Sequence, residues 1–246
     1  MMKKNLPDGN VFYLPKGSFG FNLENIDKEI DEIYNNLNPH FYEKYYEIKE
    51  GMTVVDAGAY TGIFTLKASK VVGNGGLVIA LEPFLSSFNV LKYNVKKNKC
   101  ENVILINKGL GSVKCSKRLI VGENYISATI LNKHKSSFIK LLSYLNTLYR
   151  LMRFKIKLVK VNLTTLDLLI NQYNIRKIDF LKIDVEGYEE EAILGYTKMK
   201  KGNILIIETH NNLDKMLFLI KQKGYELDTT HVVPITKSNS IIHTIL

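Results

Sequence analysis

The chain has 246 residues and a hydrophobic fraction of 46%, which is enough for one large domain with a buried core. It carries a formal net charge of +10, and it contains neither the ~18-residue apolar run of a membrane-spanning helix nor the apolar segment of a signal peptide. Its two cysteines, Cys100 and Cys115, are too few for a disulfide scaffold and too far apart for a zinc knuckle, so we expect a reduced, cytoplasmic protein.

Residues 1–50 are interpreted as an N-terminal extension. The stretch 1–24 contains several prolines and glycines and is predicted to form loops. A helix is predicted over 25–38, ended by Pro39, because apolar residues recur there at helical spacing: Ile26, Ile30, Ile33, Tyr34 and Leu37. The stretch 41–46 holds four aromatic residues and is predicted to be a short helix, which either lines a ligand site or packs on the edge of a sheet.

From residue 51 onward, short apolar strands alternate with helices. Strands are predicted at 53–57, 77–82, 103–107, 178–183, 204–207, after a turn at 224–227, and at 240–246. Helices are predicted at 62–72, 84–98, 164–173, 189–194 and 213–223. This alternation indicates an α/β fold, in which a seven-stranded, mostly parallel sheet carries helices on both faces. We assign this domain to 51–246, with a basic insertion at about 113–160.

A glycine-containing turn follows the first strand of this domain. The strand ends at Asp56, and Gly58, Ala59 and Gly62 precede the next helix. Such a strand, turn and helix start gather backbone N–H groups and the positive helix end around one small-molecule site. The turn is similar to the dinucleotide fingerprint Gly-x-Gly-x-x-Gly, but it has Ala59 in place of the middle glycine, three residues before Gly62.

The second strand ends in Glu82, which Pro83 follows. A carboxylate at this place can accept two hydrogen bonds from ribose hydroxyls. Asp56 and Glu82 therefore form a candidate nucleoside-binding pair on adjacent strand ends. The simpler alternative is that Asp56 and Gly58 only cap a strand and a helix. Two acids together with two glycines favour a cofactor site.

The fourth strand ends in Lys182, Asp184 and Glu186. Ligands of open α/β sheets bind outside the carboxyl ends of the strands, so Asp184 and Glu186 should face the same crevice as Asp56. Alternate residues of a strand share a face, and two carboxylates beside a lysine can tune one another for base catalysis. The alternative is a structural Asp184–Lys182 pair.

The fifth strand ends in Glu208 and His210, which could act as a base or as metal ligands. A histidine at a strand end can equally be a hydrogen-bonded neighbour. Asp184, Glu208 and His210 could form an oxygen-rich cation site, but their spacing is not diagnostic, so the metal requirement stays open.

Six sequence blocks, in this order between about Tyr45 and His210, resemble the FkbM-type methyltransferases. They read Val-Asp-Ala-Gly-Ala-Tyr-Thr-Gly-Ile-Phe-Thr-Leu, Leu-Glu-Pro, Asn-Lys-Gly-Leu-Gly, Thr-Thr-Leu-Asp, Phe-Leu-Lys-Ile-Asp-Val-Glu-Gly-Tyr-Glu and Ile-Glu-Thr-His. The resemblance implies a class I, Rossmann-like methyltransferase fold that uses S-adenosylmethionine (SAM). It also implies methylation of a hydroxyl group on a small molecule, a glycan or a lipid-linked saccharide.

The resemblance assigns roles to particular residues. Asp56, Gly58 and Gly62 border the methionine end of SAM, Glu82 holds the ribose, and residues around Gly109 and Leu110 line the adenine. Ala59, Tyr60 and Pro83, which lie beside these residues, complete the candidate cofactor-binding set. Asp184 faces the cofactor amino group or the acceptor, and the catalytic candidates are Asp184, Glu186 and His210. Tyr60 departs from the family, where asparagine is usual, so its role stays open. The loop 184–187 has no proline, which argues against methylation of a nucleobase amino group.

The insertion carries the net charge of the chain. It has eleven basic residues and one acid, Glu123, so eleven minus one gives +10: Lys114, Lys117, Arg118, Lys133, Lys135, Lys140, Arg150, Arg153, Lys155, Lys157 and Lys160. A helix with an apolar stripe is predicted at 137–154. It is interpreted as a lid, as a contact to an anionic membrane surface through 137–160, or as a helix packed on the core.

Two alternative functions stay open for the whole chain. It could be an NAD-dependent oxidoreductase, or a non-catalytic RNA-binding protein that uses the basic insertion.

Overall fold

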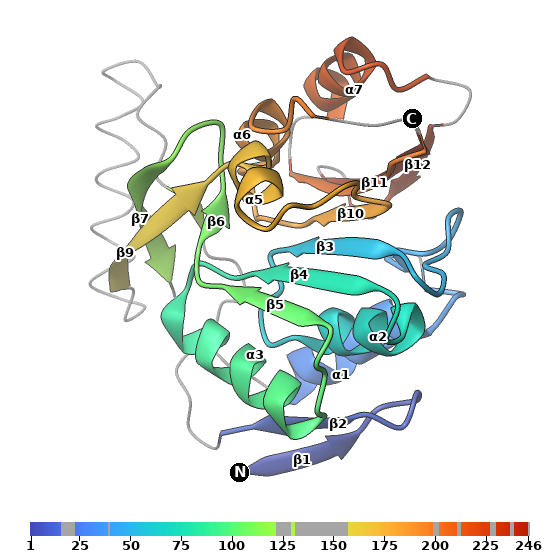
Figure 1. Cartoon of the computed structure of the whole chain (residues 1–246), viewed down its shortest axis with the longest axis vertical. Helices are drawn as coiled ribbons and strands as arrows, with labels where there is room; N and C mark the ends of the chain where they lie inside the picture. Colours follow the sequence, from blue (N-terminus) through green and yellow to red (C-terminus); the bar gives the residue numbers. More distant parts are fainter. Residues whose placement is uncertain are drawn as a thin grey trace.

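The structure is a computed structural model that describes residues 1–15, 23–38, 40–121, 129–130, 157–198, 202–210, 213–226, 230–236 and 239–245. Figure 1 shows one central sheet with helices on both faces, a small second sheet beside it and a hairpin at the N-terminus. Among the described residues, no helix is both long and apolar enough to cross a membrane.

The central sheet has seven strands in the order β12-β13-β11-β10-β3-β4-β5. Their bounds are β3 Thr53–Ala57, β4 Leu77–Leu81, β5 Val103–Ile106, β10 Phe180–Ile183, β11 Ile204–His210, β12 His231–Pro234 and β13 Asn239–Ile245. Neighbouring strands from β11 to β5 are parallel, whereas β13 is antiparallel to both β11 and β12. The predicted seven-stranded, mostly parallel sheet is therefore confirmed.

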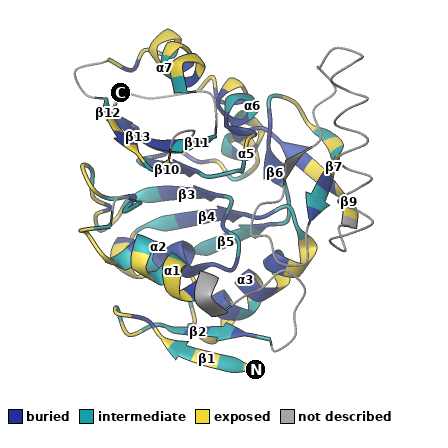
Figure 2. Cartoon of the chain, turned by 180° about the vertical axis from the view of Figure 1, so that it is seen from behind, coloured by how far each residue is buried: buried dark blue, intermediate teal, exposed yellow. Residues whose placement is uncertain are grey.

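Helices cover both faces of this sheet (Figure 1). On one face lie α1 Leu23–Tyr34, α2 Ile63–Val72 and α3 Leu85–Lys97; on the other lie α5 Leu166–Gln172, α6 Glu189–Leu194 and α7 Leu213–Gln222. Alternate strand residues point to opposite faces, so Val54 packs with the first helices and Val55 with the second. Figure 2 shows the strands buried between the two helix layers.

The N-terminal segment differs from the prediction in two places. Residues predicted as loops form a hairpin of β1 Met2–Asn5 and β2 Val11–Leu14. It is held on α3 because the side chains of Asn98 and Asn94 accept hydrogen bonds from the N–H groups of Val11 and Tyr13, both 2.8 Å long. The short helix predicted at 41–46 is wrong as well. This stretch runs in turns because its aromatic side chains pack against different neighbours.

A four-stranded second sheet has the order β6-β9-β7-β8. Its strands are β6 Gly109–Leu110, β7 Cys115–Val121, β8 Thr129–Ile130 and β9 Lys157–Thr164. Strands thus lie at both ends of the basic insertion, and Gly109 and Leu110, the candidate adenine-lining residues, form β6. The apolar face of this sheet buries Leu119, Val161 and Leu163 against Tyr188. The helix predicted at 137–154, with its interpretation as lid or membrane contact, lies outside the described residues.

The candidate active site

The predicted site residues converge at the carboxyl ends of β3 and β10, which are neighbours at the centre of the sheet. From β3 the chain adds β4 and β5 on one side, and from β10 it adds β11 on the other. This reversal of strand order is where open α/β sheets bind ligands. Ala57 lies opposite Ile183 in the register, and the N–H of Asp184 donates a 3.0 Å hydrogen bond to the Ala57 carbonyl.

The glycine turn after β3 approaches β10 very closely. Gly58 has φ +83°, and a Cβ atom there would lie 1.8 Å from the carbonyl oxygen of Asp184. The N–H groups of Gly58 and Ala59 donate to the Leu81 carbonyl, at 3.0 and 2.9 Å, which ties the turn to β4. Gly62 caps α2 with φ +98° and packs against Leu91. Only glycine fits these two places without moving a neighbour.

Two further residues of the turn bear on ligand binding. Tyr60 has φ +48°, a left-handed conformation that is rare for a bulky residue. Thr61 is completely buried, and within the part of the chain that the structure describes its hydroxyl oxygen has no hydrogen-bond partner. Buried polar atoms without a partner are uncommon in folded proteins, so a ligand that reaches Thr61 would satisfy it. Sequence reasoning missed Thr61, although its position between Tyr60 and Gly62 was a usable signal.

Glu82 is held at the end of β4 by two backbone hydrogen bonds. Its Oε2 accepts from the Tyr60 N–H at 3.0 Å and its Oε1 from the Phe84 N–H at 2.8 Å. Burial raises the pKa of Glu82 to about 8, although these hydrogen bonds oppose the shift. Gly109 lies near Pro83, since a Cβ on residue 109 would be 3.5 Å from it. Leu110 is only 2% exposed and packs in the apolar cluster of α5 to α7.

Asp56 and Lys182 form a buried ion pair between the two central strands. They are direct partners in the β3–β10 register, and Lys182 Nζ lies 3.2 Å from Asp56 Oδ1. The Thr65 hydroxyl donates to Asp56 Oδ2 at 2.6 Å, so both oxygens of this fully buried carboxylate contact protein groups. Lys182 Nζ also lies 3.7 Å from Asp184 Oδ2 and donates to the Gly58 carbonyl at 3.4 Å. Burial alone would lower the pKa of Lys182, but the charges of Asp56 and Asp184 outweigh it and raise that pKa.

The N-terminal extension supplies a residue that sequence reasoning did not single out. Tyr42 donates a 2.9 Å hydrogen bond to Asp184 Oδ2, and its hydroxyl lies 3.5 Å from Glu208 Oε2. Burial raises the pKa of Tyr42 well above its usual value, and the nearby carboxylates add to this shift. The aromatic run at 41–46 was the available signal. Glu29 of α1 also faces the site: burial raises its pKa to about 8, against the opposing charge of Lys182.

His210 joins the carboxylates of three elements. Its Nδ1 lies 2.9 Å from Glu189 Oε1, and its Nε2 lies 3.4 Å from Glu186 Oε2 and 3.8 Å from Glu208 Oε1. Burial opposes a charge on His210, but the hydrogen bond and charge of Glu189, with that of Glu186, raise its pKa to about 9. Burial and the charge of Asp184 raise the pKa of Glu208 to about 8 and that of Glu186 to about 7. The role of Glu189, in the first turn of α6, could not be read from the sequence.

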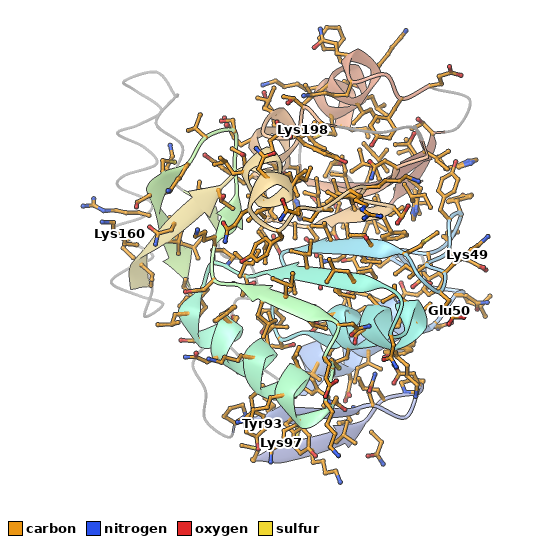
Figure 3. The ribbon with its side chains drawn as sticks, in the orientation of Figure 1. Lys49, Glu50, Tyr93, Lys97, Lys160 and Lys198 are labelled. Atoms are coloured by element: carbon orange, nitrogen blue, oxygen red, sulfur yellow. The ribbon has the colours of Figure 1, made fainter. Side chains whose placement is uncertain are left out.

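The structure therefore brings together the predicted residues of both strand ends. Asp184, Glu208 and His210 each offer one ligand atom, and these three atoms lie within 4.8 Å of one another. Glu186, which has φ +54°, turns its carboxylate to His210 rather than continuing the alternation of β10. Figure 3 shows how the remaining charged side chains, such as Lys49, Lys160 and Lys198, extend from the outer surface.

Two solved structures share this fold. Methyltransferase FkbM from Methylobacillus flagellatus KT superposes with a TM-score of 0.53 at 14% identity, over 85% of this chain and 50% of that chain. Precorrin-6y C5,15-methyltransferase from Geobacter metallireducens GS-15 superposes with a TM-score of 0.50 at 12% identity, over 96% and 98% of the two chains. The sheet order, the glycine turn and the acidic strand ends define a class I methyltransferase.

The family follows from the sequence itself. The model of the methyltransferase FkbM domain matches residues 56–227, so the chain belongs to the FkbM methyltransferase family, and SAM is its methyl donor. The chain is also 25% identical over 172 residues to Methyltransferase 1 of Beauveria bassiana (strain ARSEF 2860), which covers 68% of this chain and 67% of that protein. The alternatives of an NAD-dependent oxidoreductase and a non-catalytic RNA-binding protein give way to this membership.

Proposed function

We propose that the protein transfers the methyl group of SAM to a hydroxyl group of a small molecule, a glycan or a lipid-linked saccharide. The observation that carries this proposal is the cluster of Asp184, Glu208 and His210 beside the glycine turn, with ligand atoms within 4.8 Å of one another. An alcohol must lose its proton as it is methylated, so it needs a base within hydrogen-bond reach as well as precise orientation. The cluster offers carboxylates for this purpose, with the His210 imidazole beside them.

Observations at the cofactor side support the proposed binding residues. The close approach of Gly58 to Asp184 leaves a narrow cradle that any Cβ would fill, and the buried hydroxyl of Thr61 lacks a partner among the described residues. Gly58, Ala59, Tyr60 and Gly62 would border the methionine end, with Asp56 holding the turn from behind. Glu82 would hold the ribose beside Pro83, and Gly109 the adenine. Leu110 would contact the adenine through its backbone, because its side chain is buried in the apolar cluster of α5 to α7.

The base is proposed at Asp184 and Glu186, with His210 orienting them. When bound, SAM supplies an electrophilic methyl group, and the proton of the acceptor hydroxyl passes to a carboxylate at the strand ends. The side chain of Asp184 is 24% exposed, whereas that of Asp56 is completely buried. Only Asp184 of these two carboxylates can therefore meet an acceptor that arrives from solvent.

The test compares Asp184→Asn and Glu186→Gln with Glu190→Gln, a control in which an exposed carboxylate of α6 is neutralised. Each protein receives SAM with a labelled methyl group and a panel of acceptors: methyl glucoside, glucosamine, glucose 6-phosphate and catechol. We expect the first two variants to bind SAM like the wild type in calorimetry but to lose about a hundredfold or more in turnover. Full turnover in both would overturn the assignment of the base.

A divalent cation is the second candidate for activating the acceptor. Carboxylate and imidazole ligands suit such an ion, and Glu189 contacts Nδ1 of His210 as a partner of a metal-binding histidine would. Removal of cations with EDTA separates the two candidates. Activity that is lost and then restored by Mg²⁺ or Mn²⁺ supports the cation, and activity that survives EDTA supports the protein base.

The division of the chain is part of the same proposal. Residues 1–50 are an extension of the methyltransferase domain 51–246, and the family match, which begins at Asp56, supports this boundary. The extension packs in the same apolar cluster as the main domain, since Phe12 and Ile26 are buried with Leu66. The insertion at about 113–160 would then be a local addition to that domain.

A further inference from the structure

The segment 41–46, here called the strap, lies before the region that the family model matches. Its two ends are attached to different elements. Glu43 Oε1 lies 2.8 Å from Lys67 Nζ of α2, and the same Nζ lies 4.6 Å from the centre of the Phe41 ring. The Tyr45 ring stacks on His231 of β12 with 4.1 Å between ring centres and 7° between planes. The strap is therefore fixed on both sides of Tyr42.

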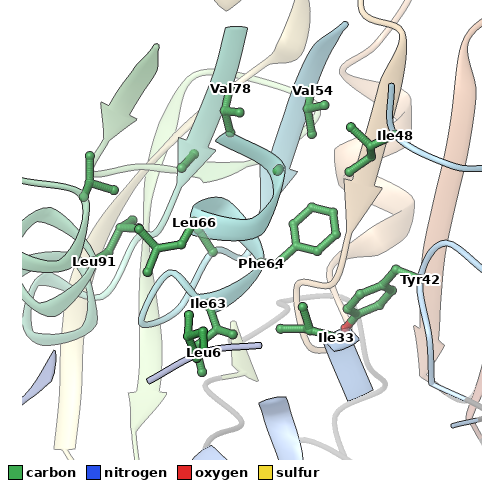
Figure 4. Close-up of a cluster of buried hydrophobic side chains, with 14 of the residues drawn as sticks. Leu6, Ile33, Tyr42, Ile48, Val54, Ile63, Phe64, Leu66, Val78 and Leu91 are labelled. Carbon is green, nitrogen blue, oxygen red and sulfur yellow. The ribbon is translucent and has the colours of Figure 1, made fainter. Parts of the chain in front are cut away.

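The ring of Tyr42 is packed as a core residue would be. It is 7% exposed and meets Phe64 edge to face at 5.6 Å, as Figure 4 shows. Lys182 Nζ lies 4.9 Å from the centre of the same ring, a distance at which a cation is attracted to the aromatic face. These contacts leave the ring one orientation, which directs its hydroxyl to the carboxylates at the ends of β10 and β11.

The hydroxyl of Tyr42 lies between two carboxylates but has a single proton. It donates to Asp184 Oδ2 at 2.9 Å, and Glu208 Oε2 is 3.5 Å away. Because one hydroxyl cannot donate to both, the other carboxylate can take a hydrogen bond from a second hydroxyl. The lone pairs of the Tyr42 oxygen can accept from that hydroxyl as well. An acceptor hydroxyl that donates its proton therefore finds two hydrogen-bond acceptors at one place, the Glu208 carboxylate and the Tyr42 oxygen.

Charged side chains around the Tyr42 hydroxyl determine which methyl acceptors can bind there. The acids that act on Tyr42 are Asp184 and Glu208, which its hydroxyl contacts, and Glu32 of α1. Glu186 and Glu189 join the same cluster through His210, and among the described residues its two cations are Lys182 and His210. All of these carboxyl groups can hydrogen-bond to hydroxyls, and those that are ionised, Asp184 above all, repel phosphate and carboxylate groups.

Resting on the proposed function, we propose that Tyr42 is a positioning residue for the acceptor, and that the acceptor is a neutral or cationic polyol such as a saccharide ring. The strap holds the Tyr42 hydroxyl against Asp184, so that the reacting hydroxyl is bound between Tyr42 and Glu208 and lies beside Asp184, the proposed base. An acceptor with an anionic group beside the reacting hydroxyl is excluded. The N-terminal extension is thus one wall of the acceptor site.

The test uses the full-length protein with two substitutions on the strap. Tyr42→Phe removes the hydroxyl and keeps the ring contacts, whereas the matched control Tyr45→Phe removes a hydroxyl and keeps the stack on His231. We expect Tyr42→Phe to lower kcat/KM for methyl glucoside about tenfold or more, mainly through the KM of the acceptor, with the Kd of SAM changed by less than about twofold. Glu208→Gln, which changes the carboxylate on the other side of the bound hydroxyl, should also lower kcat/KM for methyl glucoside.

The control Tyr45→Phe should stay within about twofold of the wild type in every constant. For the wild type we expect methyl glucoside and glucosamine to be methylated in preference to glucose 6-phosphate. Equal kcat/KM for Tyr42→Phe and Tyr45→Phe would overturn the positioning role of Tyr42 and leave the proposed function standing. A wild-type preference for glucose 6-phosphate would overturn the proposed acceptor class. A wild type that methylates none of the four panel compounds would overturn the proposed function together with this inference.

Discussion

Gly58 and Asp184 lie so close together that the backbone carbonyl of Asp184 occupies the space that a side chain on residue 58 would need. A Cβ on residue 58 would lie 1.8 Å from the Asp184 carbonyl oxygen, and φ of Gly58 is +83°. This contact joins the glycine turn after β3 to the end of β10, between the proposed cofactor and acceptor sides of the site.

Gly58→Ala should therefore remove SAM binding and lower stability. The matched control is Gly51→Ala, since Gly51 has a similar φ of +79° but no atom within 4 Å of its Cβ position. The control should cost only the left-handed strain of about 1–2 kcal/mol, whereas Gly58→Ala adds a clash with backbone. Urea unfolding and calorimetric titration of SAM measure both effects. Equal losses in the two variants would contradict the importance of the contact.

Lys182→Met should destabilise the fold. Lys182 is the cation between Asp56 and Asp184, and its loss leaves a fully buried carboxylate without its ionic partner. Breaking a buried pair by removing one partner costs about 3–5 kcal/mol. Lys160→Met, at the exposed position that Figure 3 labels on β9, is the control and should change the free energy of unfolding by less than about 0.5 kcal/mol. Similar urea midpoints for the two variants would refute this prediction.

Glu82 should make stability fall as the pH rises. Its pKa is raised from 4.5 to about 8 in the folded protein, mainly by burial, so the folded state binds the proton more tightly than the unfolded chain. The resulting stabilisation is fully present below about pH 4.5 and is lost as the pH passes through about 8. Glu82→Gln should remove this slope of up to ~1.4 kcal/mol per pH unit. Unfolding at pH 6 and pH 9 measures it, with exposed Glu101→Gln as the control. Identical pH dependence in Glu82→Gln and the wild type would count against it.

Lys99→Gly should stabilise the protein slightly. Lys99 follows α3 with φ +56°, and the next N–H, of Cys100, donates to the Val95 carbonyl at 3.1 Å in a glycine-type helix ending. Glycine adopts this conformation without strain, so we expect a gain of about 0.5–1 kcal/mol. Asn174→Gly is the control: Asn174 has φ +52° after α5, but asparagine tolerates that region. In thermal unfolding, Lys99→Gly should raise Tm more than Asn174→Gly does. A larger rise for Asn174→Gly would contradict this prediction.

The sheet and its crevice could be predicted because their signals are local. The apolar strands before Asp56, Glu82 and Asp184 end at the residues that bear charge, and parallel strands bring their carboxyl ends to one edge. The helix predicted over 164–173 was readable for the same reason: its N-cap is Thr165, whose hydroxyl accepts from the Leu168 N–H at 3.1 Å. Each of these conclusions needs only a few neighbouring residues.

The features of the structure that could not be predicted from the sequence depend on contacts between residues far apart in the chain. Tyr42 reaches Asp184 across 142 positions of sequence, and nothing near Tyr42 specifies the path of the strap. The hairpin β1–β2 is held by Asn94 and Asn98 of α3, more than eighty positions later. The β7–β9 pair joins the two ends of the basic insertion, so these two strands are far apart in sequence. Periodicity alone detects none of these partners.

The position of β13 has a consequence for the order in which the protein is made. β11 carries Glu208 and His210, and on one side it is covered by β13, whose residues 239–245 follow it by about thirty positions. On the ribosome, the apolar stretch Ile204–Ile207 is synthesised well before that partner, and until then β11 presents an open edge that can pair with other chains. Chaperone binding to the nascent chain should therefore be greatest in this interval. When β13 emerges, it covers this edge along the whole length of β11, including Glu208 and His210.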